Sequence, residues 1–547
     1  MRPIWLWRLT LDSNPSARRT WMLRRPEIVL TAALLTALAV PTALAAAVWG
    51  DARSGVLAWT TAKLAAAVIV CALPPGTLLA FLLARTDLPG RRAMSALLLL
   101  QLFTPLYLQA TAWLAGFGDR GWFTALGLGP VWLAGFSGAV WIHAAAAVPW
   151  IALLVGAGLR MVEPELEEEA LLDGNPWQVL RRVTLPAAAG AVGVAALWVA
   201  VTLAGEMTVT DLFKVRTYAE SLYTDFAVEQ EGLPLTILPG AAVTAWLTVA
   251  ALVLTAAVTS AERPATLAAR RVFALGRWRW PCGLLAALLV LLIVGVPIGN
   301  LVYTAGEVVE KTANGELARH WSPLKCLRLV ADSPREYAEQ FRWSFELGAL
   351  AATSVVALAL PLAWWARRGG WRALPALLAT AFTLALPGPI VGLGWIWFFN
   401  RPDAPLLNAL YDSQRFGPWL ALSLRSLPLT TIMLWHALRS LPPDPLEAAA
   451  AEGAGGWTRL WRVALPQRWP ALAAAWLAAF AVSLGDVSGC NILVLPPGVA
   501  PLSWRIFDLL HSGVTDQVAA LCLAVLLVVA LLVAGLARAA KSLAPGA

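Results

Sequence analysis

Two acidic side chains stand in matching places where their type and position could do chemistry. Glu206 follows Gly205 and Asp486 follows Gly485, and each pair comes at the end of an apolar segment. Asp211 follows shortly after Glu206. Carboxylate oxygens suit hard cations, so such a pair at a pore mouth would suit a cation such as ferric iron. The alternative is that the carboxylates lie at a membrane boundary, solvated or paired with arginine. The sequence makes Glu206, Asp211 and Asp486 candidates for a substrate path.

The sequence shows no phosphate-binding, catalytic or metal-binding motif. The nearest approach to a phosphate-binding GxxxxGK[ST] motif is Lys541-Ser542, which follows Ala540 where the motif requires glycine. The four histidines are scattered, and the five cysteines form no CxxC pair and no Cys/His cluster at metal spacing. We expect no enzyme active site, no bound cofactor and no metal. Cys326 and Cys490 would both face the outside, where they could form a disulfide.

The composition identifies the elements that must position these residues. Of the 547 residues, 59% are hydrophobic and only 14% are charged, against about a quarter charged in soluble chains. The repeated apolar stretches match the thickness of a bilayer core, so we expect an all-α integral membrane protein. Many of the 29 tryptophans lie at the ends of these stretches, as in an aromatic belt. The net charge of +8 lies mainly in short loops, so it indicates membrane orientation and not nucleic-acid binding.

We predict twelve spans. They cover residues 28–49, 57–83, 94–117, 131–159, 187–205, 233–260, 282–306, 341–366, 373–399, 417–438, 470–486 and 517–537. A cytoplasmic N-terminus places most arginines in cytoplasmic loops, as the positive-inside rule requires. The predicted divisions are a cytoplasmic N-terminal segment at 1–27, a first repeat at 28–260, a basic cytoplasmic linker at 261–281 and a second repeat at 282–547.

The repeat is visible in two polar stretches, EEEALLDGNPWQVLRRVTLP at 167–186 and EAAAAEGAGGWTRLWRVALP at 447–466. The numbering of the two copies differs by 280, and Gly205-Glu206 and Gly485-Asp486 match at the same offset. An even number of spans per repeat gives both repeats the same orientation, as two parallel six-helix units. Each stretch predicts a helix, a break and a second short amphipathic helix on the cytoplasmic surface. One such element could simply anchor a loop in the headgroups, but two equivalent elements suit a two-fold symmetric partner.

The second stretch resembles a known motif. Glu447-Ala448-Ala449, Gly453 and Val463-Ala464-Leu465-Pro466 are similar to the EAA loop, E-A-A-x3-G-x9-[IV]-x-L-P, of inner-membrane permeases of binding-protein-dependent ABC importers. The first copy departs from the motif, because Glu167 or Glu168 stands for its acid and Gly174 follows Asp173 one place late. The resemblance implies that the loops contact an ATPase. The implied contacts are Glu167, Glu168, Gly174, Trp177, Glu447, Ala448, Ala449, Gly453, Trp457, Leu465 and Pro466.

The whole chain looks like a fused pair of six-span permeases of the ferric-iron importer branch, with thiamine and phosphonate importers as close relatives. The segments at 206–226 and 495–521 are similar to counterparts in that branch. The resemblance implies a multi-pass protein of the inner (plasma) membrane whose partners are a cytoplasmic ATPase homodimer, which uses ATP, and an external solute-binding protein.

Ferric iron is the expected substrate, with thiamine, a phosphonate or another small solute as alternatives. A different class, an ion-coupled secondary transporter, would show inverted repeats and broken helices at the midplane of the membrane. A membrane-embedded enzyme is the third alternative.

Overall fold

The computed structural model describes residues 52–162, 164–228, 273–311, 317–401, 403–487 and 494–542. Within these ranges, seven helices are long and apolar enough to cross a membrane, and two further pairs of helices would each do so if the pair counts as one bent span. The chain is therefore a multi-pass membrane protein. The predicted spans at 28–49 and 233–260 and most of the predicted linker lie outside the described residues, so the twelve-span count and the two repeats stay predictions.

The first part of the described chain is helical. Its helices are α3 (Ala52–Arg85), α4 (Arg91–Phe103), α5 (Leu106–Phe117), α6 (Trp122–Ala125), α7 (Gly135–Arg160), α8 (Pro164–Asp173), α9 (Pro176–Val179), α10 (Leu185–Ala204), α11 (Thr208–Leu212) and α12 (Tyr218–Val228). A π-helical turn at Leu180–Thr184 joins α9 to α10. Helices α3, α7 and α10 pack against one another through a continuous apolar core.

The second part of the described chain is also mostly helical. Its helices are α14 (Arg279–Val290), α15 (Val296–Gly306), α16 (Pro323–Glu336), α17 (Ala338–Ala366), α18 (Leu374–Ala385), α19 (Gly388–Phe399), α20 (Pro405–Tyr411), α21 (Phe416–Arg439), α22 (Pro443–Ala451), α23 (Gly456–Arg459), α24 (Leu465–Gly485), α26 (Leu502–Leu510) and α27 (Asp516–Ser542). Helices α17, α21 and α24 pack together as α3, α7 and α10 do. Another π-helical turn, Leu460–Ala464, lies at the matching place before α24.

Two predicted spans are not straight helices. The prediction at 94–117 corresponds to α4 and α5, which meet at 104°, and the prediction at 373–399 corresponds to α18 and α19, which meet at 101°. In each pair a proline follows the break, and the residue before it is extended, with ψ of 122° at Thr104 and 117° at Leu386. Proline disfavours a helical conformation for the preceding residue and has no N–H to donate, which accounts for both breaks. The predicted span 417–438 is the single helix α21, which is not one of the seven helices that are long and apolar enough to cross a membrane.

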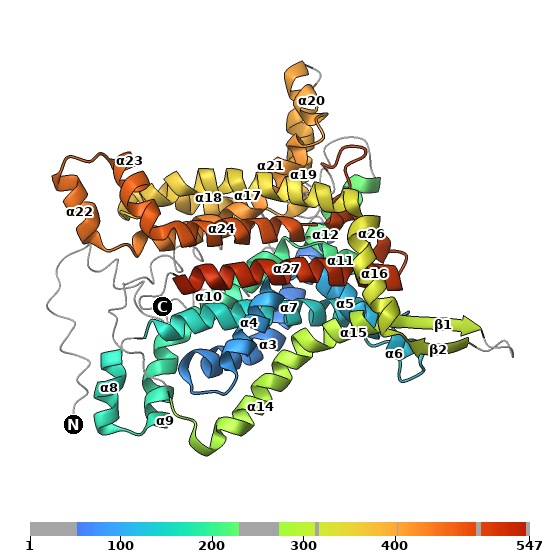
Figure 1. Ribbon diagram of the computed structural model, residues 1–547, viewed down its shortest axis with the longest axis horizontal. Helices are drawn as coiled ribbons and strands as arrows, with labels where there is room; N and C mark the ends of the chain where they lie inside the picture. The colour runs from blue at the N-terminus through green and yellow to red at the C-terminus, as the bar shows by residue number, and fades with distance from the viewer. Residues whose placement is uncertain are drawn as a thin grey trace.

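The described chain also contains a small sheet, which the all-α prediction did not include. Strands β1 (Glu307–Lys311) and β2 (Leu317–Trp321) form an antiparallel hairpin in which Glu307 pairs with Trp321. Figure 1 shows this hairpin, with α16 beside it, at one end of the molecule, and the pairs α8–α9 and α22–α23 at the other. We call these the hairpin end and the loop end.

Candidate functional site

The two matched carboxylates line one cavity. It has a volume of about 280 Å³, and its wall includes Glu206 and Asp486 together with His143 of α7 and Arg425 of α21. The break between α4 and α5, the adjoining ends of α10 and α24, and residues of α3 and α7 contribute the rest of the wall. The prediction that Glu206 and Asp486 lie together near a path is therefore compatible with their placement. His143 and Arg425 were not among the predicted site residues, because a lone basic residue in an apolar helix carries no pattern of its own.

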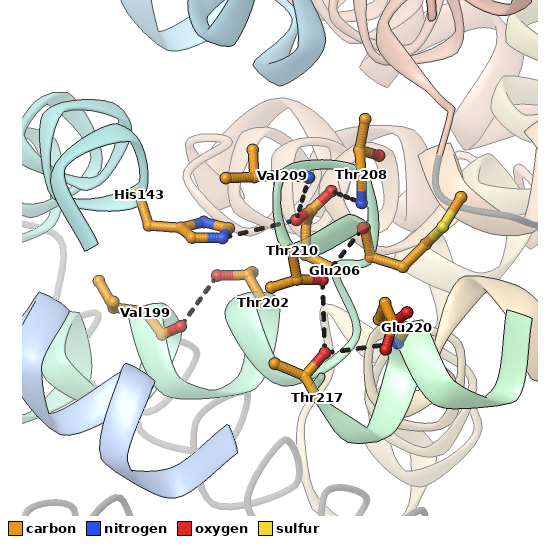
Figure 2. Close-up of polar contacts among 10 residues, drawn as sticks. His143, Val199, Thr202, Glu206, Thr208, Val209, Thr210, Thr217 and Glu220 are labelled. Carbon is orange, nitrogen blue, oxygen red and sulfur yellow. Dashed lines mark hydrogen bonds and ion pairs between the residues drawn. The ribbon is translucent and has the colours of Figure 1, made fainter. Parts of the chain in front are cut away.

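Glu206 is held in a fixed position at the start of α11. Its carboxylate accepts hydrogen bonds from the backbone N–H groups of Thr208 (2.6 Å) and Val209 (3.2 Å), which caps the helix. The Glu206 carboxylate also contacts His143, whose Nε2 lies 3.5 Å from Oε2 (Figure 2). Behind Glu206, the Thr217 hydroxyl lies 3.4 Å from that of Thr210 and links this turn to α12.

Asp486 has an arginine partner. Its Oδ1 lies 3.4 Å from Nε of Arg425, and the aspartate side chain is 4% exposed. Pairing with arginine is the alternative that the sequence left open for this carboxylate. The ion pair still lies in the cavity wall, so a ligand in the cavity would meet both groups.

Aromatic and amide groups complete the wall. The rings of Trp150 on α7 and Trp198 on α10 lie with their centroids 4.8 Å apart, and both border the cavity. Gln109 also borders the cavity, although its amide is engaged because it donates to the backbone oxygen of Thr104 at 2.9 Å. Ring faces attract cations, and carboxylates bind them, so the wall suits a cationic ligand.

A reciprocal contact joins the two parts of the chain beside the cavity. A Cβ on Gly485, the residue before Asp486, would lie 3.4 Å from the ring of Pro105 at the α4–α5 break. A Cβ on Gly205, the residue before Glu206, would lie 3.4 Å from Cα of Pro387 at the α18–α19 break. Each helix break thus packs on the glycine that precedes the carboxylate of the other part.

Asp211, the third predicted path residue, lies apart from Glu206 and Asp486. It does not border the cavity, and its Oδ2 lies 3.3 Å from Nε2 of His511, which follows α26. Among the described residues there is no group of three or more His, Cys, Asp and Glu side chains that could hold a metal.

The two polar stretches have the predicted form of a helix, a break and a short second helix. Helix α8 leads to α9, and α22 leads to α23, and each short helix continues through a π-helical turn into a long helix. Gly453, with φ of +84°, ends α22 in the left-handed region that glycine tolerates best. Trp177 and Trp457 are 67% and 60% exposed, so both present large apolar surfaces at the loop end.

The remaining predicted contact residues differ in exposure. Ala448, Gly453 and Pro466 are exposed, as Glu447 is. Ala449 and Gly174 are half-buried, and Leu465 is buried at the base of α24. Leu465 therefore supports the loop from within.

The placement of Glu167 differs from that of Glu447. Glu167 is fully buried, whereas Glu168 and Glu447 are both exposed. Counted from the first residues of their helices, Pro164 and Pro443, Glu168 corresponds to Glu447, and Glu167 corresponds to the buried Leu446. The offset is 279 between Glu168 and Glu447 but 280 between Trp177 and Trp457, so the first copy has a one-residue deletion between its acid and its tryptophan. Glu168 is consequently the acid that stands in the motif position, and Glu167 is not available to a partner.

Glu167 instead attaches α8 to the body of the protein. Its carboxylate forms an ion pair with Arg85 at the end of α3 and accepts a hydrogen bond from the Thr184 hydroxyl at 2.6 Å. Arg85 also donates to the backbone oxygen of Leu159 at 3.2 Å.

The second part of the chain fills the same position with apolar residues. Ala366 ends α17, Leu446 lies on α22 and Ala464 ends the π-helical turn, and all three belong to one buried cluster.

Part of the chain matches a described family. Residues 355–546 match the family of binding-protein-dependent transport system inner membrane components. This stretch contains α21 to α27, and with them Glu447, Trp457, Arg425 and Asp486.

Three relatives are similar over shorter stretches. The chain is 37% identical over 101 residues to the spermidine/putrescine transport system permease protein PotC of Haemophilus influenzae, covering 17% of this chain and 37% of the relative. It is 33% identical over 105 residues to PotC of Escherichia coli K12, covering 19% and 39%. It is 27% identical over 162 residues to the putative 2-aminoethylphosphonate transport system permease protein PhnV of Salmonella paratyphi A, covering 29% and 58%.

These matches, together with the multi-pass helical fold, support the class of inner-membrane permeases of ABC importers. The chain spans between about a third and somewhat more than half of the length of the relatives it matches.

Proposed function

We propose that this chain is the permease subunit of an ATP-driven importer and contains two permease repeats. The observation that carries the proposal is the pair of matching elements at the loop end, α8–α9 and α22–α23, each presenting an exposed acid and an exposed tryptophan. A dimeric ATPase would hold one element in each subunit, because a two-fold partner offers two equivalent binding positions. The loop end is then cytoplasmic.

The proposal of two repeats is supported by matching elements that follow one another in the same order. Trios of packed helices, proline breaks and π-helical turns occur in the same order in both parts. The reciprocal contacts of Gly205 with Pro387 and of Gly485 with Pro105 are those expected of a pseudo-two-fold axis that passes near the cavity.

For the substrate we propose a small solute that carries a cationic amine. The cavity brings Glu206, Asp486 and two tryptophan rings together, and this combination binds ammonium groups. The named substrates of the relatives, spermidine, putrescine and 2-aminoethylphosphonate, all contain an amine. Arg425 in the same wall would meet an anionic group of a zwitterionic solute. The ferric iron of the expected branch has no comparable support from these relatives.

The test is uptake into proteoliposomes that contain the chain with its co-purified ATPase and binding protein. Labelled putrescine, 2-aminoethylphosphonate and ferric iron are offered separately, with and without ATP on the ATPase side. ATP-dependent uptake of an amine supports both proposals, and ATP-dependent uptake of iron alone would overturn the amine assignment. Uptake that follows an imposed ion gradient and ignores ATP would make the chain a secondary transporter.

A further inference from the structure

Arg367 and Arg459 lie at the loop end of the second part of the chain, close enough for the charge of Arg459 to act on Arg367. Arg367 directly follows Ala366 at the end of α17, and Arg459 directly precedes Leu460 at the start of the π-helical turn. Ala366 and Leu460 belong to the same buried cluster, so the two arginines emerge together at its edge. Arg368 is exposed beside them.

The two guanidinium groups are partly withdrawn from water and lack an anion. In both arginines Nε is buried and has no hydrogen-bond partner, and none of Arg367, Arg368 and Arg459 forms an ion pair with an acid in the described part of the chain. Burial is the main cause that lowers the pKa of Arg367, and the charges of Arg368 and Arg459 lower it further. A half-buried guanidinium whose Nε–H makes no hydrogen bond is stabilised by an anion, so this arrangement favours binding of an external one.

The corresponding position in the first part of the chain already contains an anion. Arg85, which ends α3 as Ala366 ends α17, pairs with the carboxylate of Glu167. In the second part the residue that corresponds to Glu167 is Leu446, and the arginine lies one position further along the chain. The first part of the chain thus supplies its own counter-charge at the base of α8–α9, whereas the second part supplies none at the base of α22–α23.

The surroundings indicate where the anion comes from. The guanidinium carbon of Arg367 lies 3.8 Å from the centroid of the Trp364 ring. Trp365, Trp371 and Trp461 are 45%, 65% and 59% exposed around the arginines. Exposed indoles next to basic side chains are typical of the depth at which lipid headgroups lie. The planar guanidinium forms paired hydrogen bonds with phosphate oxygens.

The geometry points to a binding site for the phosphate of an anionic phospholipid headgroup, held by Arg367 and Arg459 with Arg368 at its rim. The lipid would supply to α22–α23 the counter-charge that Glu167 supplies to α8–α9. Free phosphate offers the same chemistry and is the other source that the experiment must separate.

The experiment measures lipid retention on the full-length chain by native mass spectrometry. The protein is taken from bilayers that contain equal amounts of phosphatidylglycerol and phosphatidylcholine. The test variant is Arg367→Gln/Arg459→Gln. The matched control is Arg181→Gln/Arg182→Gln, which removes the same charge from the exposed arginines of the π-helical turn before α10. Size-exclusion chromatography and a measurement of helix content would check that both variants fold.

We expect preferential retention of phosphatidylglycerol by the unchanged chain and by the control, and a loss of about tenfold or more for each arginine removed in the test variant. Equal retention in test and control variants would overturn the site. Displacement of the lipid by millimolar inorganic phosphate would assign the site to free phosphate and overturn the lipid assignment. Unchanged lipid retention together with loss of ATPase binding in the test variant would show that the arginines serve a partner protein, which would also overturn it.

Discussion

Glu167 of α8 and Arg85 at the end of α3 form an ion pair that is fully buried at the base of α8–α9, the first of the two loop elements. A buried charge that loses its partner is far more costly than a buried pair or its apolar replacement. The pair therefore acts as a mechanical attachment between the loop element and a transmembrane helix. In the second part of the chain, packing between Leu446, Ala366 and Ala464 makes the same attachment.

The first prediction concerns this attachment. Glu167→Gln should lower the free energy of unfolding by about 3–5 kcal/mol, because it leaves the Arg85 charge buried without its partner. The triple variant Arg85→Ala/Glu167→Leu/Thr184→Ala copies the second part of the chain and should stay within about 1 kcal/mol of the unchanged protein. Denaturant unfolding in detergent measures both. A triple variant as unstable as Glu167→Gln would show that the two attachments are not equivalent.

The second prediction separates exposed acids that contact a partner from those that do not. Glu168→Arg/Glu447→Arg should reduce ATP-dependent uptake by about tenfold or more, because charge reversal at an interface opposes association. The protein should still insert, since both side chains are exposed.

The control for this variant is Glu165→Arg/Glu452→Arg, which reverses charge at exposed positions of the same two elements. Equal losses of uptake in the two double variants would mean that general surface charge, and not the motif acid, governs coupling.

The third prediction tests the reciprocal glycine–proline contacts between the two parts of the chain. At Gly485 an added Cβ would make ordinary contact with Pro105 at 3.4 Å, so Gly485→Ala should be tolerated. Gly485→Val adds branches that must displace the proline, at a cost of about 1–3 kcal/mol, and should slow transport by separating the two parts. Gly394→Val is the control, because a Cβ there meets no atom within 4 Å. Transport rates of Gly485→Val equal to those of Gly394→Val would contradict a functional contact.

The sequence predicted much of this arrangement because its signals are local. Apolar length indicated the spans that the described residues contain, the matched copies at 167–186 and 447–466 indicated α8–α9 and α22–α23, and the same offset of 280 paired Glu206 with Asp486. The 101° and 104° bends were missed because an apolar run hides a break that depends on one proline.

The burial of Glu167 was missed for a different reason. Its partner Arg85 is distant in sequence, and the deletion in the first copy shifted the alignment by one residue, which on a helix moves a side chain by about 100°. Pairings of His143 with Glu206 and of Arg425 with Asp486 likewise depend on contacts between helices that no local pattern specifies.

The fourth prediction distinguishes Glu206, which lines the cavity, from Asp211, which does not. Glu206→Gln should weaken amine uptake by about tenfold, because a charge-assisted contact contributes about 1.5–3 kcal/mol and a neutral amide cannot supply it. The Gln oxygen can still accept from the Thr208 N–H, so the cap of α11 is largely kept and the effect reports on charge. Asp211→Asn, outside the cavity and paired with a half-exposed His511, should leave uptake unchanged. Initial uptake rates at several amine concentrations separate the two, and a loss in Asp211→Asn as large as that in Glu206→Gln would move the path away from the cavity.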